Sequence, residues 1–257
     1  FDFMTHYLSE VLNYEYLVPS HYSGLEPSAD TPNYFAAIKP GKFYIWEFDV
    51  DWNSFISSFG INLSPNYIIN TDTSAIWATG SIVPQWEVPE MVDVHGERLG
   101  TPMQYRIVDG VPGLWVTHAV EANPGPGTGQ RWYEIRFDEQ DEPLFFQTGT
   151  HTPDNDYRWN GSLAVDGAGN MALGYNTSTD ESDPAQAFYP EIRYAGRLKT
   201  DLNGTLPRTE VLFEEGGFPI YDGSQYDNDG VPDGPWGRQS HMSVDPLDDC
   251  IFWYTNM

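Results

Sequence analysis

A strand–turn–strand pattern that recurs without sequence identity is the strongest constraint on this chain. Residues 162–175 and 241–254 both contain a Val-Asp pair, a four-residue turn and an apolar run ending in Tyr, at the same offsets. Looser copies lie at residues 108–116 and 37–46. Strand, polar turn and strand, repeated at intervals of tens of residues, are typical of a radially repeated β-fold.

The repeats divide the chain into units about as long as one propeller blade. Residues 103–152 are predicted to form four antiparallel strands, and residues 161–215 repeat that plan. We therefore expect an all-β fold, a β-propeller of four-stranded antiparallel blades, as a single segment over residues 1–257. The further expected parts are a looser unit at 34–100, an acidic insertion at 216–235 and the start of another blade at 240–257. Because a closed ring needs at least four blades, we expect an incomplete blade set from a longer chain.

The charge balance restricts the partners. The chain has 38 Asp and Glu residues against 12 Lys and Arg residues, a net charge of −26. Such a chain repels nucleic acid and anionic membranes, so neither is an expected partner. No stretch approaches the roughly 20 apolar residues of a membrane-spanning helix, so we expect no membrane insertion. A glycan, a surface protein or a homo- or hetero-oligomeric extracellular assembly are the expected partners.

The second half resembles a family of secreted, uncharacterised bacterial β-propeller proteins that are loosely similar to sialidase/BNR-type propellers. The matching motifs are GQRWYEIR at 129–136, YRWNGSLAVD at 157–166, GNMALGY at 169–175, PEIRYAGRL at 190–198 and most of 236–256. The resemblance implies a propeller fold and a secreted, extracellular or cell-surface location, without an established reaction. The strict sialidase Asp-box, Ser-x-Asp-x-Gly-x-Thr-Trp, is absent, which argues against sialidase activity.

Arginine and tryptophan pairs occur just before two predicted inner strands, where a propeller has its central funnel. The candidate ligand-binding residues are Arg158, Trp159, Trp236, Arg238 and His241. Arg can bind a carboxylate or sulfate through two hydrogen bonds, and Trp can stack on a sugar. Alternatively, each Arg pairs with an acid of a neighbouring blade and each Trp packs between blades. Both interpretations stay open.

The acidic insertion contains the motif DNDGVPD at 227–233, which resembles thrombospondin-type and dockerin-like calcium loops. The carboxylates of Asp227, Asp229 and Asp233 and the carbonyl of Val231 could converge on one ion. Calcium takes six to eight such oxygen ligands, so Ca²⁺ is the expected cofactor. The alternative is a solvated acidic turn.

No set of residues predicts catalysis. Asp166 and Asp245 recur at the same turn position, which indicates that they cap hairpins. The single cysteine, Cys250, is expected to be a small buried apolar residue.

Three functions are compatible with these features. The preferred hypothesis is a non-catalytic, secreted or cell-surface binding or structural module, stabilised by calcium. The first alternative is a carbohydrate-active enzyme, a hydrolase or lyase, that acts on acidic polysaccharide. The second alternative is a subunit of an extracellular assembly whose blade edges join neighbouring chains.

Overall fold

The described part of the chain is built from β-strands. The computed structural model describes residues 14, 16–51, 56–71, 82–94, 96, 98–122, 127–220, 236–237 and 239–256. Within these ranges it contains seventeen strands, which confirms the all-β prediction. No helix among the described residues is long and apolar enough to cross a membrane.

The largest sheet has nine strands in the order β11-β10-β9-β8-β1-β2-β3-β4, with β5 also paired to β3. Only the β1–β8 pair within this sheet is parallel. This pair therefore joins two antiparallel meanders, one on each side. The strands are β1 (Val18–Tyr22), β2 (Asn33–Lys39), β3 (Lys42–Asp51), β4 (Ile56–Phe59), β5 (Tyr67–Asn70), β8 (Met103–Val108), β9 (Val111–Glu121), β10 (Thr128–Phe137) and β11 (Pro143–His151).

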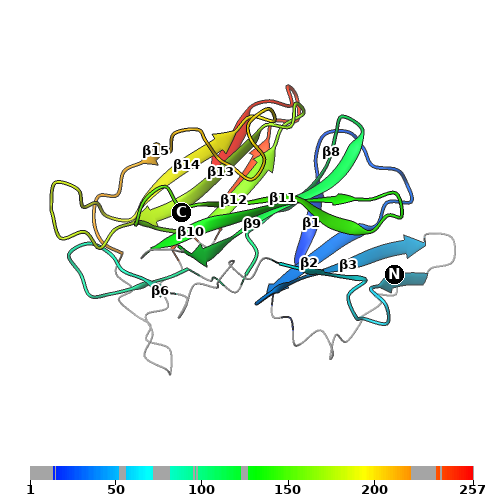
Figure 1. The fold of residues 1–257 in the computed structure, drawn as a ribbon, viewed down its shortest axis with the longest axis horizontal. Helices are drawn as coiled ribbons and strands as arrows, with labels where there is room; N and C mark the ends of the chain where they lie inside the picture. Colours follow the sequence, from blue (N-terminus) through cyan, green and yellow to red (C-terminus); the bar gives the residue numbers. More distant parts are fainter. Residues whose placement is uncertain are drawn as a thin grey trace, which may run out of the picture.

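The two halves of this sheet pack against each other. One core cluster contains Ala36 and Phe43 from β2 and β3 together with Leu114 and Tyr133 from β9 and β10. In Figure 1 the blue strands β2 and β3 lie below the green strands β9–β11. The sheet therefore folds over at the β1–β8 pair, and apolar burial holds its halves together.

A second, four-stranded antiparallel sheet packs on the other face of β9 and β10. Its strands are β12 (Tyr157–Val165), β13 (Met171–Ser178), β14 (Glu191–Arg197) and β15 (Val211–Glu214), in that order. Trp115 and Trp132 point towards this sheet and form a second core with Leu163 and Leu173. Because β9 and β10 are covered on both faces, their buried residues are nearly continuous.

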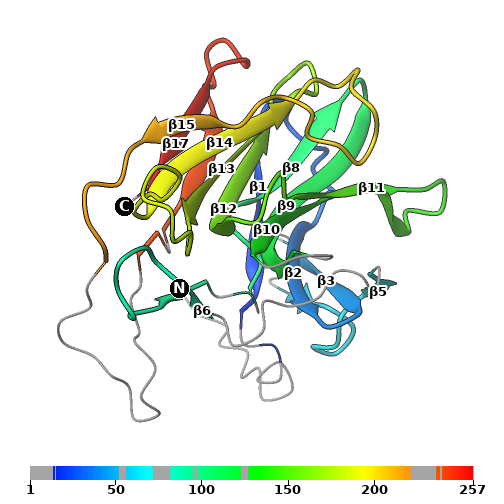
Figure 2. The ribbon, with the colours of Figure 1, turned by 60° about the vertical axis from the view of Figure 1, so that its left-hand side comes forward.

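A final hairpin covers the far face of β12 and β13. It consists of β16 (His241–Val244) and β17 (Phe252–Thr255), and Figure 2 shows it in red beside the second sheet. Ala164 packs with Met242 and Val244 in this interface. A Cβ at Gly174 would lie 2.5 Å from the Tyr254 ring, so this close approach requires glycine. A separate two-stranded sheet is formed by β6 (Ile82–Val83) and β7 (Val92–Asp93).

The hairpin turns follow the prediction for their aspartates. Asp166 Oδ1 accepts hydrogen bonds from the backbone amides of Ala168 and Asn170, and Asp245 Oδ1 accepts one from Leu247. Both residues are therefore turn caps, as predicted. The expectation for Cys250 is wrong, because this residue is exposed. It belongs to the turn, and β17 starts only at Phe252.

The strand positions predicted for residues 103–152 and 161–215 are those of β8–β11 and β12–β15. The looser unit expected at 34–100 shares the nine-stranded sheet with the next unit through the β1–β8 pairing. Closure of these sheets around one axis stays a prediction.

Candidate functional site

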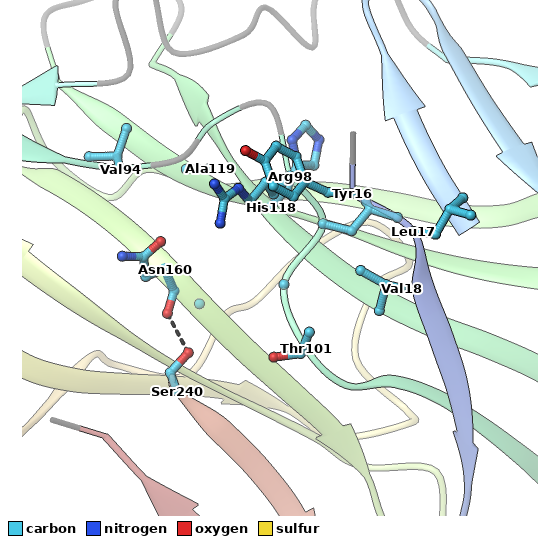
Figure 3. A pocket seen from close by; sticks show the side chains of 13 residues that line it. Tyr16, Leu17, Val18, Val94, Arg98, Thr101, His118, Ala119, Asn160 and Ser240 are labelled. Carbon is cyan, nitrogen blue, oxygen red and sulfur yellow. Dashed lines mark hydrogen bonds between the residues drawn. The ribbon is translucent and has the colours of Figure 1, made fainter. Parts of the chain in front are cut away.

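A cleft of about 320 Å³ lies where β1, β9, β12, Val94 and residues 98–101 come together. Figure 3 shows the side chains that line it. The lining residues with polar side chains are Tyr16, Arg98, Thr101, His118, Asn160 and Ser240. We call it the Asn160 cleft.

An irregularity in β12 places Asn160 at the cleft. The pairing of β12 with β13 shifts register between Trp159 and Ser162, and Asn160 has a φ of 47°. This left-handed conformation is uncommon for residues other than glycine, although Asn tolerates it better than most. Glycine at position 161 leaves room for the buried Gln130 side chain, whose Oε1 would lie 2.2 Å from a Cβ there. Bulges of this kind often re-aim a side chain near a functional site.

Hydrogen bonds to Trp236 and Ser240, which lie far along the chain, hold the bulge in place. Asn160 Nδ2 donates to the carbonyl of Trp236 at 3.2 Å, and Ser240 Oγ donates to the carbonyl of Asn160 at 2.6 Å. Among the described residues, none donates a hydrogen bond to Asn160 Oδ1, so this oxygen remains an acceptor at the cleft. The backbone of the bulge is therefore fixed, while Asn160 Oδ1 can accept a hydrogen bond from a ligand.

A cation and an aromatic ring also line the cleft. The guanidinium carbon of Arg98 lies 3.5 Å from the centre of the Tyr16 ring, within the range of a cation–π contact. The two residues come from segments far apart in the sequence. Together they present a positive charge and an aromatic edge to the cleft.

His118 forms a neutral part of the cleft wall. It is buried, and its Nε2 lies 3.0 Å from the hydroxyl oxygen of Tyr133. The pKa of His118 is lowered to about 4, chiefly by burial and also by the positive charge of Arg131, although hydrogen bonds to the backbone at Gly96 and Ala119 oppose this change. The imidazole is therefore uncharged at neutral pH.

The cleft differs in charge from the chain as a whole. None of the described residues that line it carries a carboxylate, although the chain has a net charge of −26. The described residues also contain no group of three His, Cys, Asp or Glu side chains placed to hold a metal ion. The chemistry at the cleft is thus that of hydroxyls, an amide, an aromatic ring and one cation.

Arg158, the first predicted funnel residue, is buried in a charge network. Its side chain is 0% exposed, and it forms ion pairs with Asp154 at 2.8 Å and Glu210 at 2.8 Å. Although burial by itself lowers the pKa of Arg158, the two carboxylates raise it above its ordinary value. Arg158 therefore pairs with acids, but Glu210 directly precedes β15 of the same sheet, so the predicted pairing with an acid of a neighbouring blade is not what this residue shows.

Glu210 is the centre of this network. Its carboxylate accepts hydrogen bonds from Arg158, from Tyr175 at 2.5 Å and from Arg193 at 2.6 Å, and it lies 3.2 Å from His151 Nε2. Burial by itself raises the pKa of Glu210, but its hydrogen-bond donors lower it far below the ordinary value. The network ties β11 to the second sheet.

Of the other predicted funnel residues, the described ones, Trp159, Trp236 and His241, do not line the cleft. Trp159 is fully buried and packs in a core cluster, with its ring 6.2 Å from that of Trp236. His241 is exposed at the start of β16. Arg238 lies outside the described residues, and so do the predicted calcium ligands Asp227, Asp229, Val231 and Asp233.

The segments that carried the prediction nevertheless reach the cleft through neighbouring residues. Asn160 and Gly161 follow the predicted Arg158 and Trp159, and Ser240 precedes the predicted His241. Sequence reasoning missed Asn160 because a bulge cannot be read from alternation alone. The Asn-Gly pair inside a strand-like run was the available signal, since both residues tolerate positive φ.

Comparisons with protein-family models, curated proteins and solved structures found no match to this chain.

Proposed function

We propose that this chain is part of a secreted, propeller-type binding module and that the Asn160 cleft holds a glycan. The observation that carries the proposal is the bulge that keeps the Asn160 side chain at a cleft without carboxylates in its described lining. The module acts by binding and leaves its ligand intact.

The order of packing supports the propeller. The β2–β3 meander packs face to face on β9–β10, these strands pack on β12–β13, and those in turn pack on the β16–β17 hairpin. Consecutive antiparallel meanders stacked in chain order are the arrangement of propeller blades. The resemblance to secreted propeller proteins supports the same fold and a location outside the cell.

The lining chemistry supports a sugar. A volume of about 320 Å³ falls within the range of small-molecule sites. Sugar hydroxyls both donate and accept hydrogen bonds, so they can pair with the Asn160 amide oxygen, the Thr101 hydroxyl and the Arg98 guanidinium. The edge of the Tyr16 ring, one face of which is covered by the Arg98 guanidinium, adds an apolar surface beside the sugar.

The burial of Arg158 favours a binding function over a catalytic one. The enzyme hypothesis placed Arg158, Arg238 and nearby aromatic residues around a substrate. The Arg158 side chain is fully buried between Asp154 and Glu210, and Arg238 lies outside the described residues. Glycoside hydrolysis generally uses two carboxyl groups on either side of the scissile bond. The described lining of the Asn160 cleft offers none.

The assembly hypothesis keeps one supporting observation. β15 is the edge strand of the second sheet, and all four of its residues are exposed, including Leu212 and Phe213. An exposed apolar edge can pair with another chain. We retain an extracellular assembly as the second candidate function, and a calcium-stabilised loop at 227–233 stays a prediction.

The test is a glycan screen followed by titration calorimetry of the strongest hit. Asn160→Gly removes the amide while keeping a residue that accepts positive φ. Asn62→Gly is the matched control, because Asn62 also has a positive φ, at 52°, and does not line the cleft. Loss of a hydrogen bond worth about 1 kcal/mol should weaken binding by Asn160→Gly roughly fivefold to tenfold.

The control variant should bind like the unmodified protein. Equal affinity of Asn160→Gly and Asn62→Gly would show that the glycan does not use this cleft. A screen without hits would remove the glycan from the proposal.

A further inference from the structure

A second cleft lies in the seam between the two large sheets. It has a volume of about 270 Å³ and is lined by residues of all the strands from β8 to β14 and of the turns beside them. Its walls include Trp115, Trp132 and Met171. None of these residues lines the Asn160 cleft. We call this second space the seam cleft.

The lining of the seam cleft is positively charged. Arg136, Arg197 and Lys199 line it, against one carboxylate, Glu134, among its described lining residues. Both oxygens of Glu134 are already used, because they accept hydrogen bonds from Arg136 and Gln147. In a chain with 12 basic and 38 acidic residues, this concentration of cations is the reverse of the general charge.

Two residues that line this cleft carry buried donors without an acceptor in the described part of the chain. Arg197 is 5% exposed and donates from its terminal nitrogen to the carbonyls of Asp201 and Leu202. Its Nε, however, has no hydrogen-bond acceptor among the described residues. The indole nitrogen of Trp132, which is 1% exposed, also has none. Buried donors without acceptors are uncommon and costly, so each calls for an explanation.

Burial disfavours the charged form of one of these cations. Burial lowers the pKa of Arg197 below its ordinary value, whereas the negative charges of Glu134 and Asp201 oppose that change. The Arg197 guanidinium also lies 5.5 Å from the centre of the Trp132 ring. An added negative charge would therefore stabilise a cation that the fold only partly compensates.

We propose that the seam cleft binds a small organic oxyanion of the carboxylate class. Its oxygens would accept hydrogen bonds from Arg197. The positive charges of Arg136 and Lys199 would attract its negative charge. Its carbon skeleton would lie against the Trp132 and Met171 walls. This site is separate from the Asn160 cleft and does not depend on the glycan proposal.

Titration calorimetry with benzoate tests the proposal, with benzamide as the neutral probe of the same shape. Benzoate should bind and benzamide should bind at least fivefold more weakly. Lys199→Gln should weaken benzoate binding, because it removes a positive charge at the cleft. The expected loss is only roughly twofold to fivefold, since Lys199 is 42% exposed and already pairs with Asp109. Lys42→Gln, an exposed position that does not line the cleft, is the matched control.

Substitution of the buried Arg197 should weaken benzoate binding more than substitution of Lys199. Arg197→Lys keeps the charge but removes Nε, and it should weaken benzoate binding by about tenfold. If this variant fails to fold, Lys199→Gln and Lys42→Gln still decide the question. Asn160→Gly should bind benzoate like the unmodified protein.

Three results would overturn the proposal. The first is equal binding of benzoate and benzamide, and the second is equal benzoate affinity of Lys199→Gln and Lys42→Gln. The third is inorganic sulfate binding as tightly as benzoate, because the apolar walls would then contribute nothing to recognition.

Discussion

Replacement of Glu210 by Gln tests whether the buried charge network holds the second sheet in place. Glu210 is 10% exposed and lies within hydrogen-bond distance of four side chains, including Arg158, which is 0% exposed. Glutamine keeps one acceptor oxygen but removes the negative charge. Arg158 would then retain only Asp154, which is 46% exposed, as its ion-pair partner.

The expected loss of stability is large for a single substitution. Removal of one partner from a buried ion pair costs about 3–5 kcal/mol, because the other charge stays buried. For a chain of this size, that corresponds to a fall in Tm of roughly 6–20 °C. Glu214→Gln is the matched control, because Glu214 is exposed on β15, and it should change stability by less than about 0.5 kcal/mol.

Urea denaturation followed by circular dichroism measures both variants at pH 7 and at lower pH. The folded-state pKa of Glu210 is far below the ordinary value of 4.5. Its stabilising contribution is therefore complete above pH 4.5 and decreases as the pH falls towards the folded-state pKa. The difference between the unmodified protein and Glu210→Gln should thus narrow on acidification below pH 4.5. A loss under 1 kcal/mol at pH 7 would refute the reasoning.

Three further predictions concern the scaffold. The His118 imidazole should titrate near pH 4 by NMR, so stability falls between pH 6.5 and 4 as the unfolded state takes up a proton; titration near 6.5 would show that it is not buried. Gly174→Ala should cost about 1–3 kcal/mol in urea denaturation, because its Cβ meets the Tyr254 ring. Gly217→Ala, with nothing within 4 Å, should be neutral, and equal effects would contradict this packing. Asp166→Ala should destabilise by about 1–2 kcal/mol in the same assay, since two backbone amides lose their acceptor; an unchanged midpoint would exclude a capping role.

The strands were predictable because their signals are local. β12 and β13 flank a turn in which Asp166 accepts two backbone hydrogen bonds and Gly169 takes a φ of 84°. Such turn chemistry and the alternating apolar residues beside it can be read within about ten residues.

The pairing of β1 with β8 could not be read in this way. Ser20 pairs with Met103 across a long stretch of chain. Neither strand contains a residue that specifies this partner, because parallel pairing is set by tertiary packing. The same limit applies to how the meanders stack.

The charge network around Glu210 shows why the functional sites are harder to predict from the sequence than the strands. Arg158 was chosen as a ligand-binding residue because arginine beside tryptophan suits an acidic sugar. Its partner Glu210 lies 52 positions away in the sequence. Only the fold shows that the Arg158 guanidinium already binds this carboxylate. Asn160 was missed for a related reason, since its role depends on a bulge and on contacts with Trp236 and Ser240.

Proton NMR of the strongest glycan hit in the presence of the protein tests the central claim most directly. The account predicts a saturation-transfer signal on the sugar, weakened by Asn160→Gly and kept by Asn62→Gly, while the anomeric resonances stay unchanged during prolonged incubation. New anomeric resonances, or a transfer signal equal in both variants, would contradict a non-catalytic binding site at the Asn160 cleft.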